Sequence, residues 1–169
     1  MRIPFLSQTP KEFVVEPLTQ ADSDALAVLH KEDFVRPWSA DEFSSLLEQD
    51  TVFGYGAREV GQGAKAPAGF VLARLAAGEG EILTVAVARS HRRQGIGWRL
   101  MDAVLRELHG QRAEALFLEV DENNLPAIAL YRRLGFGEVG RRANYYGSSE
   151  RGPGGALVMR RDLHARSGQ

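Results

Sequence analysis

A glycine-containing turn is the feature of this chain whose residue types point most directly to chemistry. The segment Arg92-Arg93-Gln94-Gly95-Ile96-Gly97 lies between an apolar run, residues 82–88, and an amphipathic run, residues 98–108. Glycines in a strand-to-helix turn let successive backbone N–H groups approach a ligand at the positive end of the following helix. The neighbouring arginines add positive charge. The turn therefore predicts an anion site, with phosphate as the expected ligand.

The residues around this turn exclude two well-known phosphate-binding motifs. No GxxxxGK[ST] pattern is present, because Trp98 and Arg99 follow Gly97. The dinucleotide fingerprint GxGxxG lacks its third small residue, and the turn follows several expected strands instead of the first one. The sequence thus argues against nucleoside-triphosphate and dinucleotide sites. The large ring of Trp98 either covers the ligand or faces solvent.

Two side chains downstream of the turn are suited to acid–base chemistry. Glu119 interrupts the apolar run 115–120, and the period-two alternation of a strand places it on the face of Phe117, opposite its apolar neighbours. Unpaired burial of a carboxylate is costly, so Glu119 must end in water, pair with an arginine or line a polar cleft. Tyr131 offers a phenol on a short helical segment, or is simply an aromatic residue of the core.

Composition narrows the class of protein. A chain of 169 residues predicts one domain, and 21 basic against 22 acidic side chains give a net charge of −1, which argues against a nucleic-acid partner. Cysteine is absent, which excludes disulfides and thiol chemistry. The histidines are scattered, so we expect surface or capping roles and no metal for His30, His91, His109 and His164. No stretch approaches the roughly 20 apolar residues of a membrane span, so a soluble cytoplasmic protein without a membrane partner is expected.

The elements that position these residues follow from periodicity and capping signals. Alternating or continuous apolar patterns predict strands over residues 13–18, 51–58, 68–75, 81–88, 115–120, 136–146 and 155–162. Helical periodicity predicts helices over residues 19–31, after the capping box Ser39-Ala40-Asp41-Glu42, over residues 98–111, and from Asn123 and Asn124 to Gly135. The nearly continuous apolar strand 81–88 is expected to be covered on both faces. The result is a mixed α/β domain with helices on the faces of a central sheet.

With these elements in place, the sequence resembles the GCN5-related N-acetyltransferase (GNAT) family. The pattern [R/Q]-x-x-G-x-[G/A] matches residues 92–97, and the downstream matches are Leu118-Glu119-Val120, Asn123-Asn124, Ala129-Leu130-Tyr131 and Leu134-Gly135-Phe136. The resemblance implies the acyl-CoA N-acyltransferase fold, a mixed and mostly antiparallel sheet flanked by helices. It places one domain over residues 13–163, with residues 1–12 as an N-terminal extension and residues 164–169 as a tail.

Within this family the chain is most similar to the RimI group, which acetylates the N-terminal alanine of a ribosomal protein. Pro37-Trp38-Ser39 and Arg142-x-Asn144-Tyr145-Tyr146 add to the likeness. The resemblance implies acetyl transfer from acetyl-CoA, without a metal, to a protein N-terminal α-amine, with a small-subunit ribosomal protein as the expected partner. Two alternatives stay open, a lysine or small-molecule amine as acceptor, or a non-catalytic acyl-CoA-binding module. The oligomeric state is also open.

The same resemblance assigns a role to each candidate site residue. It gives Glu119 as general base and Tyr131 as general acid. Cofactor contacts are implied for Val85, Ala86, Val87, Arg92, Arg93, Gln94, Gly95, Ile96, Gly97, Trp98 and Asn124. Helix capping is the alternative for Asn124. Candidates for the acceptor side, each with plain packing as the alternative, are Trp38, Arg142, Asn144 and Tyr145. The glycine- and serine-rich stretch 147–155 is a further candidate to cover the acceptor.

Overall fold

One seven-stranded sheet organises the chain. The computed structural model describes residues 11–62, 66–143 and 154–164, and in these ranges the strand order is β1-β2-β3-β4-β5-β7-β6. Every neighbouring pair is antiparallel except β4 and β5. The strands are β1 (Phe13–Pro17), β2 (Val52–Glu59), β3 (Gly69–Ala76), β4 (Glu79–Val87), β5 (Ala115–Asp121), β6 (Gly137–Arg142) and β7 (Ala156–Asp162). The predicted α/β class with a mixed, mostly antiparallel sheet is confirmed.

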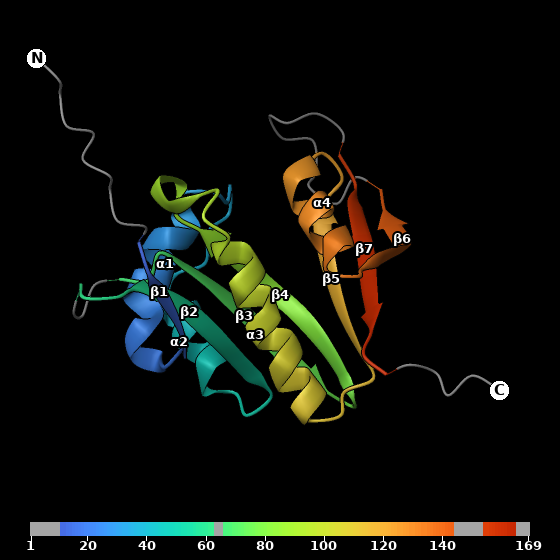
Figure 1. The fold of residues 1–169 in the computed structure, drawn as a ribbon, viewed down its shortest axis with the longest axis horizontal. Helices are drawn as coiled ribbons and strands as arrows, with labels where there is room; N and C mark the ends of the chain where they lie inside the picture. Colours follow the sequence, from blue (N-terminus) through green and yellow to red (C-terminus); the bar gives the residue numbers. More distant parts are fainter. Residues whose placement is uncertain (1–10, 63–65, 144–153, 165–169) are drawn as a thin grey trace, which may run out of the picture.

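Helices cover both faces of the sheet. They are α1 (Ser23–Lys31), α2 (Ala40–Glu48), α3 (Ile96–Gly110) and α4 (Leu125–Arg133). In Figure 1, α3 and α4 lie in front of the sheet, α3 across β2 to β4 and α4 beside β5 and β7. The helices α1 and α2 pack against β2, β3 and β4 through a second apolar cluster on the opposite face. No helix in the described ranges is long and apolar enough to cross a membrane.

Local sequence signals predict the start of α2 correctly but not the start of α1. The predicted capping box of α2 is present, since the Ser39 hydroxyl accepts from the Glu42 N–H at 3.2 Å and the Glu42 carboxylate accepts from the Ser39 N–H at 2.7 Å. The helix predicted from Thr19 begins at Ser23 instead, because residues 20–22 form a 3-10 turn. The strand predicted over residues 136–146 ends at Arg142 in the described ranges.

A β-bulge in β4 changes which face its side chains reach. Leu72 pairs with Thr84 and Ala73 pairs with Ile82, so Leu83 is an extra residue on β4. A bulge breaks the period-two alternation locally. Ile82 therefore belongs to the core under α3, and Leu83 packs with the cluster under α1 and α2. After the bulge Val85 and Val87 return to the α3 side, so the expectation that both faces of this strand are covered is confirmed.

His30 is buried at the centre of the second cluster, so the expectation that it is a surface or capping residue is wrong. Its side chain is on α1, and the residue is 1% exposed. The Nδ1 atom accepts from the Trp38 N–H at 3.0 Å, and Nε2 lies 3.1 Å from Thr84 Oγ1. The imidazole also stacks on the Phe34 ring, with centroids 3.9 Å apart. Because Nδ1 accepts, the proton of the neutral ring lies on Nε2 and is donated to Thr84.

Burial makes the folded protein favour the neutral form of His30. Desolvation lowers the pKa of His30 to about 4, against the opposing effect of the Asp33 and Glu42 carboxylates. In the unfolded chain an imidazole titrates near its ordinary value of about 6.5. Between these two values the unfolded chain binds the proton and the folded chain does not.

Stability should therefore fall with acidification in a defined window. As the pH drops from about 6.5 to about 4, the free energy of unfolding should decrease by on the order of 3 kcal/mol through His30. Urea unfolding of the wild type and of His30→Gln at a series of pH values measures this contribution as the difference between two curves. Parallel curves for the two proteins across this window would contradict it.

Candidate functional site

The sheet opens between its two parallel strands. Pairing of β4 with β5 covers only Glu79 to Glu81 opposite Ala115 to Phe117. Beyond this point, residues 82–87 pair with β3 but have no ladder partner on the β5 side within the described chain. Backbone N–H and C=O groups along such an edge need a hydrogen-bonding partner. The edge formed by Val85, Ala86 and Val87 is therefore available to a ligand that carries amides.

The predicted anion turn lies where β4 leads into α3. Arg93 and Gly95 both have left-handed backbones, with φ of 64° and 74°. Gly95 adopts this conformation without a Cβ penalty, whereas Arg93 is strained by on the order of 1 kcal/mol. The first intrahelical bond of α3 runs from the Arg99 N–H to the Gly95 carbonyl. The N–H groups of residues 96–98 precede it and have no partner within the helix.

Gly97 differs from Gly95 in what the backbone requires. Its φ is not positive, and a Cβ built on it would meet only Leu130 Cδ2, at 3.4 Å. The chain itself could thus hold a methyl group at Gly97 in contact with Leu130, whereas a Cβ built on Gly95 would meet nothing within 4 Å. Next to Gly97, the Trp98 side chain is 46% exposed at the start of α3.

The arginines near this turn differ in whether they form an ion pair within the described part of the chain. Arg92 forms an ion pair with Asp33, which follows α1, and Arg89 lies 3.5 Å from the same carboxylate. Arg93 makes no ion pair within the described part of the chain. The structure therefore directs the Arg92 guanidinium toward the end of α1, and its contact with a cofactor stays a prediction.

Glu119 lies on β5, and its side chain has an ion-pair partner that the sequence did not identify. Leu118 and Val120 belong to the core on the α3 and α4 side, so Glu119 points to the other face, as the alternation predicted. Its side chain is 26% exposed, and its Oε1 lies 3.1 Å from the Nε of Arg142, at the end of β6. Of the three outcomes considered for this carboxylate, the arginine pair is the one observed.

Tyr131 lies on the opposite side of β5. It is 6% exposed on α4, and its ring packs edge-on against Phe136 with centroids 5.9 Å apart. Burial raises the pKa of Tyr131 to about 12. Its hydroxyl makes no hydrogen bond within the described residues. Glu119 and Tyr131 thus lie on opposite faces of the sheet at β5.

Of the other predicted site residues, the structure describes Asn124 and Trp38 but not Asn144 and Tyr145. Asn124 caps α4, since its Oδ1 accepts from the Ala127 N–H at 3.3 Å, and a cofactor contact by its remaining atoms stays a prediction. Trp38 is half-buried in the connection between α1 and α2, on the sheet face that Glu119 also reaches. Asn144, Tyr145 and residues 147–153 lie outside the described ranges.

A second carboxylate near the site escaped the sequence analysis. Glu122 accepts from two nitrogens of Arg141, at 2.7 and 2.9 Å, and from the Gly155 N–H at 3.0 Å. The Arg141 guanidinium and the Gly155 amide lower the pKa of Glu122 to about 2. This contact ties the end of β5 to β6 and to the start of β7. No local pattern signals it, because the partners are 19 and 33 positions away.

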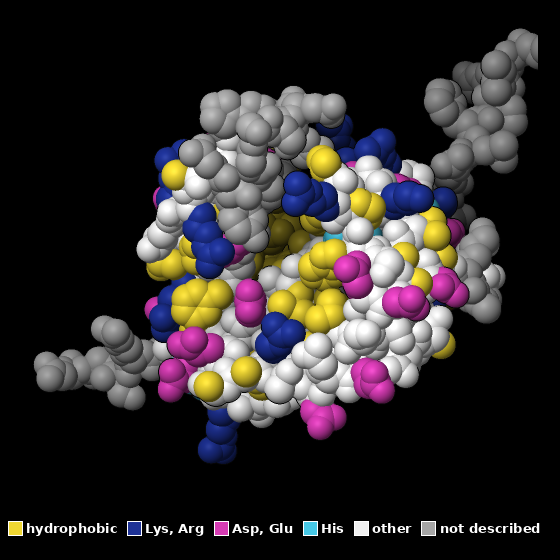
Figure 2. Space-filling model, turned by 180° about the vertical axis from the view of Figure 1, so that it is seen from behind, with side chains coloured by type: hydrophobic (Ala, Val, Ile, Leu, Met, Phe, Trp, Pro, Cys, Tyr) yellow, Lys and Arg dark blue, Asp and Glu magenta, His cyan; other side chains and the backbone are white. Residues whose placement is uncertain are grey.

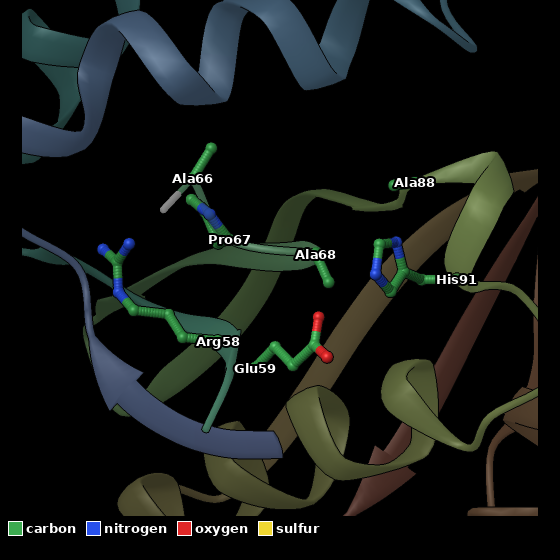
Figure 3. A pocket seen from close by; sticks show the side chains of 7 residues that line it. All are labelled: Arg58, Glu59, Ala66, Pro67, Ala68, Ala88 and His91. Atoms are coloured by element: carbon green, nitrogen blue, oxygen red, sulfur yellow. The ribbon is translucent and has the colours of Figure 1, made fainter. Parts of the chain in front are cut away.

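Two hollows of the described structure lie beside this opening. A pocket of about 110 Å³ lies where β2 and β3 approach the loop after β4, and Glu59 and His91 extend toward each other across it (Figure 3). None of the predicted site residues lines it. A wider hollow of about 300 Å³ includes Glu79, Glu81 and Phe117, where the pairing of β4 and β5 ends. On the face that is seen in Figure 2, hydrophobic side chains gather around a recess with charged side chains at its borders.

Within the described ranges, no three histidine, aspartate or glutamate side chains are grouped so that they could hold a metal ion.

Fold and site together define an N-acetyltransferase. The profile of the acetyltransferase (GNAT) family matches residues 23–136. The chain belongs to this family, as its motifs predicted.

The relatives extend this assignment. The [ribosomal protein bS18]-alanine N-acetyltransferase of Escherichia coli K12 is 32% identical over 123 residues, which are 73% of this chain and 79% of the relative. An N-alpha-acetyltransferase of Sulfurisphaera tokodaii is 40% identical over 73 residues, 43% of this chain and 44% of the relative. The predicted likeness to the RimI group is therefore confirmed.

Solved structures agree in fold. The crystal structure of the ribosomal-protein-S18-alanine N-acetyltransferase from Escherichia coli superposes with a TM-score of 0.82 at 27% identity, covering 92% of this chain and 97% of that one. Arabidopsis thaliana NAA60 in complex with acetyl-CoA has the same fold, with a TM-score of 0.80 at 19% identity over 91% of this chain and 100% of that one.

The two glycines of the turn should respond differently to the same substitution. Gly95→Ala places a Cβ on a left-handed residue and should lower the free energy of unfolding by about 1 kcal/mol. Gly97→Ala removes a glycine from a helix without a positive φ and should leave stability unchanged or raise it by up to about 1 kcal/mol. Thermal or urea unfolding without ligand measures both effects. Equal losses in the two variants would show that the backbone needs both glycines.

Proposed function

We propose that this enzyme transfers the acetyl group of acetyl-CoA to the N-terminal α-amine of a protein, with the N-terminal alanine of a small-subunit ribosomal protein as the leading acceptor. The observation that carries the proposal is the opening between β4 and β5, with Glu119 on one face and Tyr131 on the other. The named activity of the Escherichia coli relative supports the choice of acceptor.

The donor binds from the α3 and α4 side. The unpartnered N–H groups at the start of α3 and the Arg93 guanidinium hold the pyrophosphate. Pantetheine lies along Val85, Ala86 and Val87, where its amides complete the ladder that β5 leaves open. Gly95 leaves room for this approach, because a Cβ built on it would meet nothing within 4 Å. The thioester is thereby brought to the opening in the sheet.

The acceptor approaches from the α1 and α2 side. Its amine enters between Trp38 and the Glu119–Arg142 pair, and its ammonium form meets the carboxylate that Arg142 orients. An α-amine has a pKa of about 7.7 to 8.0, against about 10.4 for lysine, so roughly a tenth of N-termini are already neutral at pH 7. A moderate base therefore suffices for an N-terminal acceptor, which favours it over lysine.

The chemical step then needs few groups. The amine nitrogen attacks the thioester carbon, the C–S bond breaks, and Glu119 takes the amine proton directly or through one water. The Tyr131 hydroxyl faces the leaving sulfur. A phenol with a pKa of about 12 is a weaker acid than a thiol with a pKa of about 8.5, so complete proton transfer from it costs roughly 5 kcal/mol. Tyr131 therefore acts through a hydrogen bond that strengthens as charge builds on the sulfur.

The function is tested with acetyl-CoA and three peptides, which begin with alanine, begin with methionine, or have a blocked N-terminus and an internal lysine. We expect the highest kcat/KM with the alanine peptide. Glu119→Gln should lower kcat roughly 100-fold and leave the KM for acetyl-CoA unchanged, because the base acts only on the acceptor.

Glu122→Gln is the matched control for this variant. It also removes a carboxylate that pairs with an arginine of β6, so an equal loss in both variants would assign the effect to lost ion pairs. A higher kcat/KM for lysine or for a small amine would replace the proposed acceptor. Binding of acetyl-CoA without turnover on any amine would indicate a non-catalytic module.

The role of Tyr131 has its own test. Tyr131→Phe retains the edge-on ring contact with Phe136 and removes the hydroxyl that would meet the sulfur. We expect kcat to fall by roughly 10-fold to 100-fold, the loss of one preorganised hydrogen bond in the transition state, with unchanged thermal stability. Steady-state kinetics with the alanine peptide and a thermal melt measure both quantities. A full kcat in the variant would leave Tyr131 as a core residue only.

A further inference from the structure

We propose that His30 is a positioning residue that places Trp38 on the acceptor side and ties it to β4, the strand proposed to bind the donor. The part of this inference that concerns the acceptor rests on the function proposed above. The contact itself does not, because it consists of hydrogen bonds and ring contacts within the folded chain.

The first half of the contact fixes the connection between α1 and α2. Residues 32–39 belong to no helix or strand, and the N–H groups of Asp33 and Phe34 donate to the His30 carbonyl in the turn that follows α1. The Trp38 N–H donates to His30 Nδ1 at 3.0 Å, and the two rings stack with centroids 5.0 Å apart and an angle of 26°. On the other side of the imidazole lies Phe34, at 3.9 Å and 9°. The Trp38 backbone is thus held by the His30 side chain, and the Trp38 ring by His30 together with Phe43, whose ring centroid is 5.5 Å away.

The second half of the contact reaches β4. The Nε2–H of His30 donates to Thr84 Oγ1 at 3.1 Å, inside the core. The bulge at Leu83 is what turns Thr84 toward α1. Val85, the first residue of the edge assigned to pantetheine, follows directly. The buried imidazole of His30, a residue that is 1% exposed, therefore connects Trp38 on the proposed acceptor side with Thr84 on β4, the strand proposed to bind the donor.

Both nitrogens of the imidazole are used, one as acceptor and one as donor. Moving Trp38 relative to β4 would leave at least one buried polar group unpaired, which is unfavourable because that group has also lost its hydrogen bonds to water. A histidine that serves only to fill the core would not depend on which nitrogen keeps its partner. This difference separates a positioning role from packing.

Two substitutions each retain one of the two hydrogen bonds. An asparagine amide oxygen can replace Nδ1 as the acceptor for Trp38, and a glutamine amide nitrogen can replace Nε2 as the donor to Thr84. We expect His30→Gln to raise the KM for an alanine-initiated peptide about fivefold to tenfold, the equivalent of one lost hydrogen bond. His30→Asn should raise that KM by a smaller factor, because it keeps the hydrogen bond to Trp38 and loses only the one to Thr84. The KM for acetyl-CoA should stay the same in both variants.

A second pair of variants avoids replacing the imidazole. Thr84→Val keeps the branched shape and removes the acceptor of the Nε2 proton, whereas Thr84→Ser keeps the hydroxyl. The valine variant should raise the peptide KM and the serine variant should restore it. Equal effects of asparagine and glutamine at His30, together with no difference between valine and serine at Thr84, would overturn the positioning role.

A fluorescence measurement separates this inference from the proposed function. The chain has two tryptophans, Trp38 and Trp98, so Trp98→Phe leaves Trp38 as the only reporter. In this background His30→Gln should move the emission maximum to longer wavelength, because Trp38 loses its anchor and gains solvent, and His30→Asn should not. The same spectrum for both variants would overturn the inference. Absence of peptide turnover in the wild type, with the expected spectra, would overturn only the proposed acceptor.

Discussion

Three residue pairs of parallel ladder hold β4 to β5, and the site depends on the ladder ending there. If the pairing continued, the backbone of Val85 to Val87 would be satisfied by β5 and no ligand could add to it. An edge left open inside a sheet carries unpaired N–H and C=O groups, which native proteins normally pair or cover. The opening is tolerated because one apolar core continues beneath it, from α3 through β5 to α4. The apolar core thus joins the two halves of the sheet, although β4 and β5 are not paired beyond Glu81 and Phe117.

The opening also separates the chemistry into two sides. The anion turn and Tyr131 lie on the side of α3 and α4, while Glu119, Arg142 and Trp38 lie on the side of α1 and α2. A donor and an acceptor that arrive from opposite faces meet only at the opening, which fixes the direction of attack without a large enclosed cavity. The modest hollows of the structure are consistent with such a site. Glu119 can be a carboxylate in this position because an arginine on β6 compensates its charge.

Local chemistry made much of this arrangement predictable from the sequence. The capping box at Ser39 and the alternation around Glu119 each depend on residues within a few positions, and each was correctly predicted; the cap at Asn124 is the alternative to a cofactor contact that its position before a helix suggested. Contacts between distant segments were not predictable in this way. The pairing of Arg92 with Asp33 spans 59 positions, and that of Glu122 with Arg141 spans 19. The bulge at Leu83 follows from how β3 and β4 pair, so no pattern within β4 alone shows it. His30 looked like a surface residue because its burial depends on helices and strands that fold around it.

The chemistry of the His30 position explains why an imidazole suits it. The site needs an acceptor for the Trp38 N–H and a donor for Thr84, in a flat group that fits against Phe34. A carboxylate offers no donor when ionised, and an ammonium offers no acceptor. A neutral imidazole offers both on one rigid ring, and the lowered pKa of His30 keeps it neutral at physiological pH. Rigidity matters here because an asparagine or glutamine amide can replace only one of the two nitrogens and would lose the stacking on Phe34 and Trp38. The same ring that stabilises the second core therefore also ties Trp38 to Thr84 of β4.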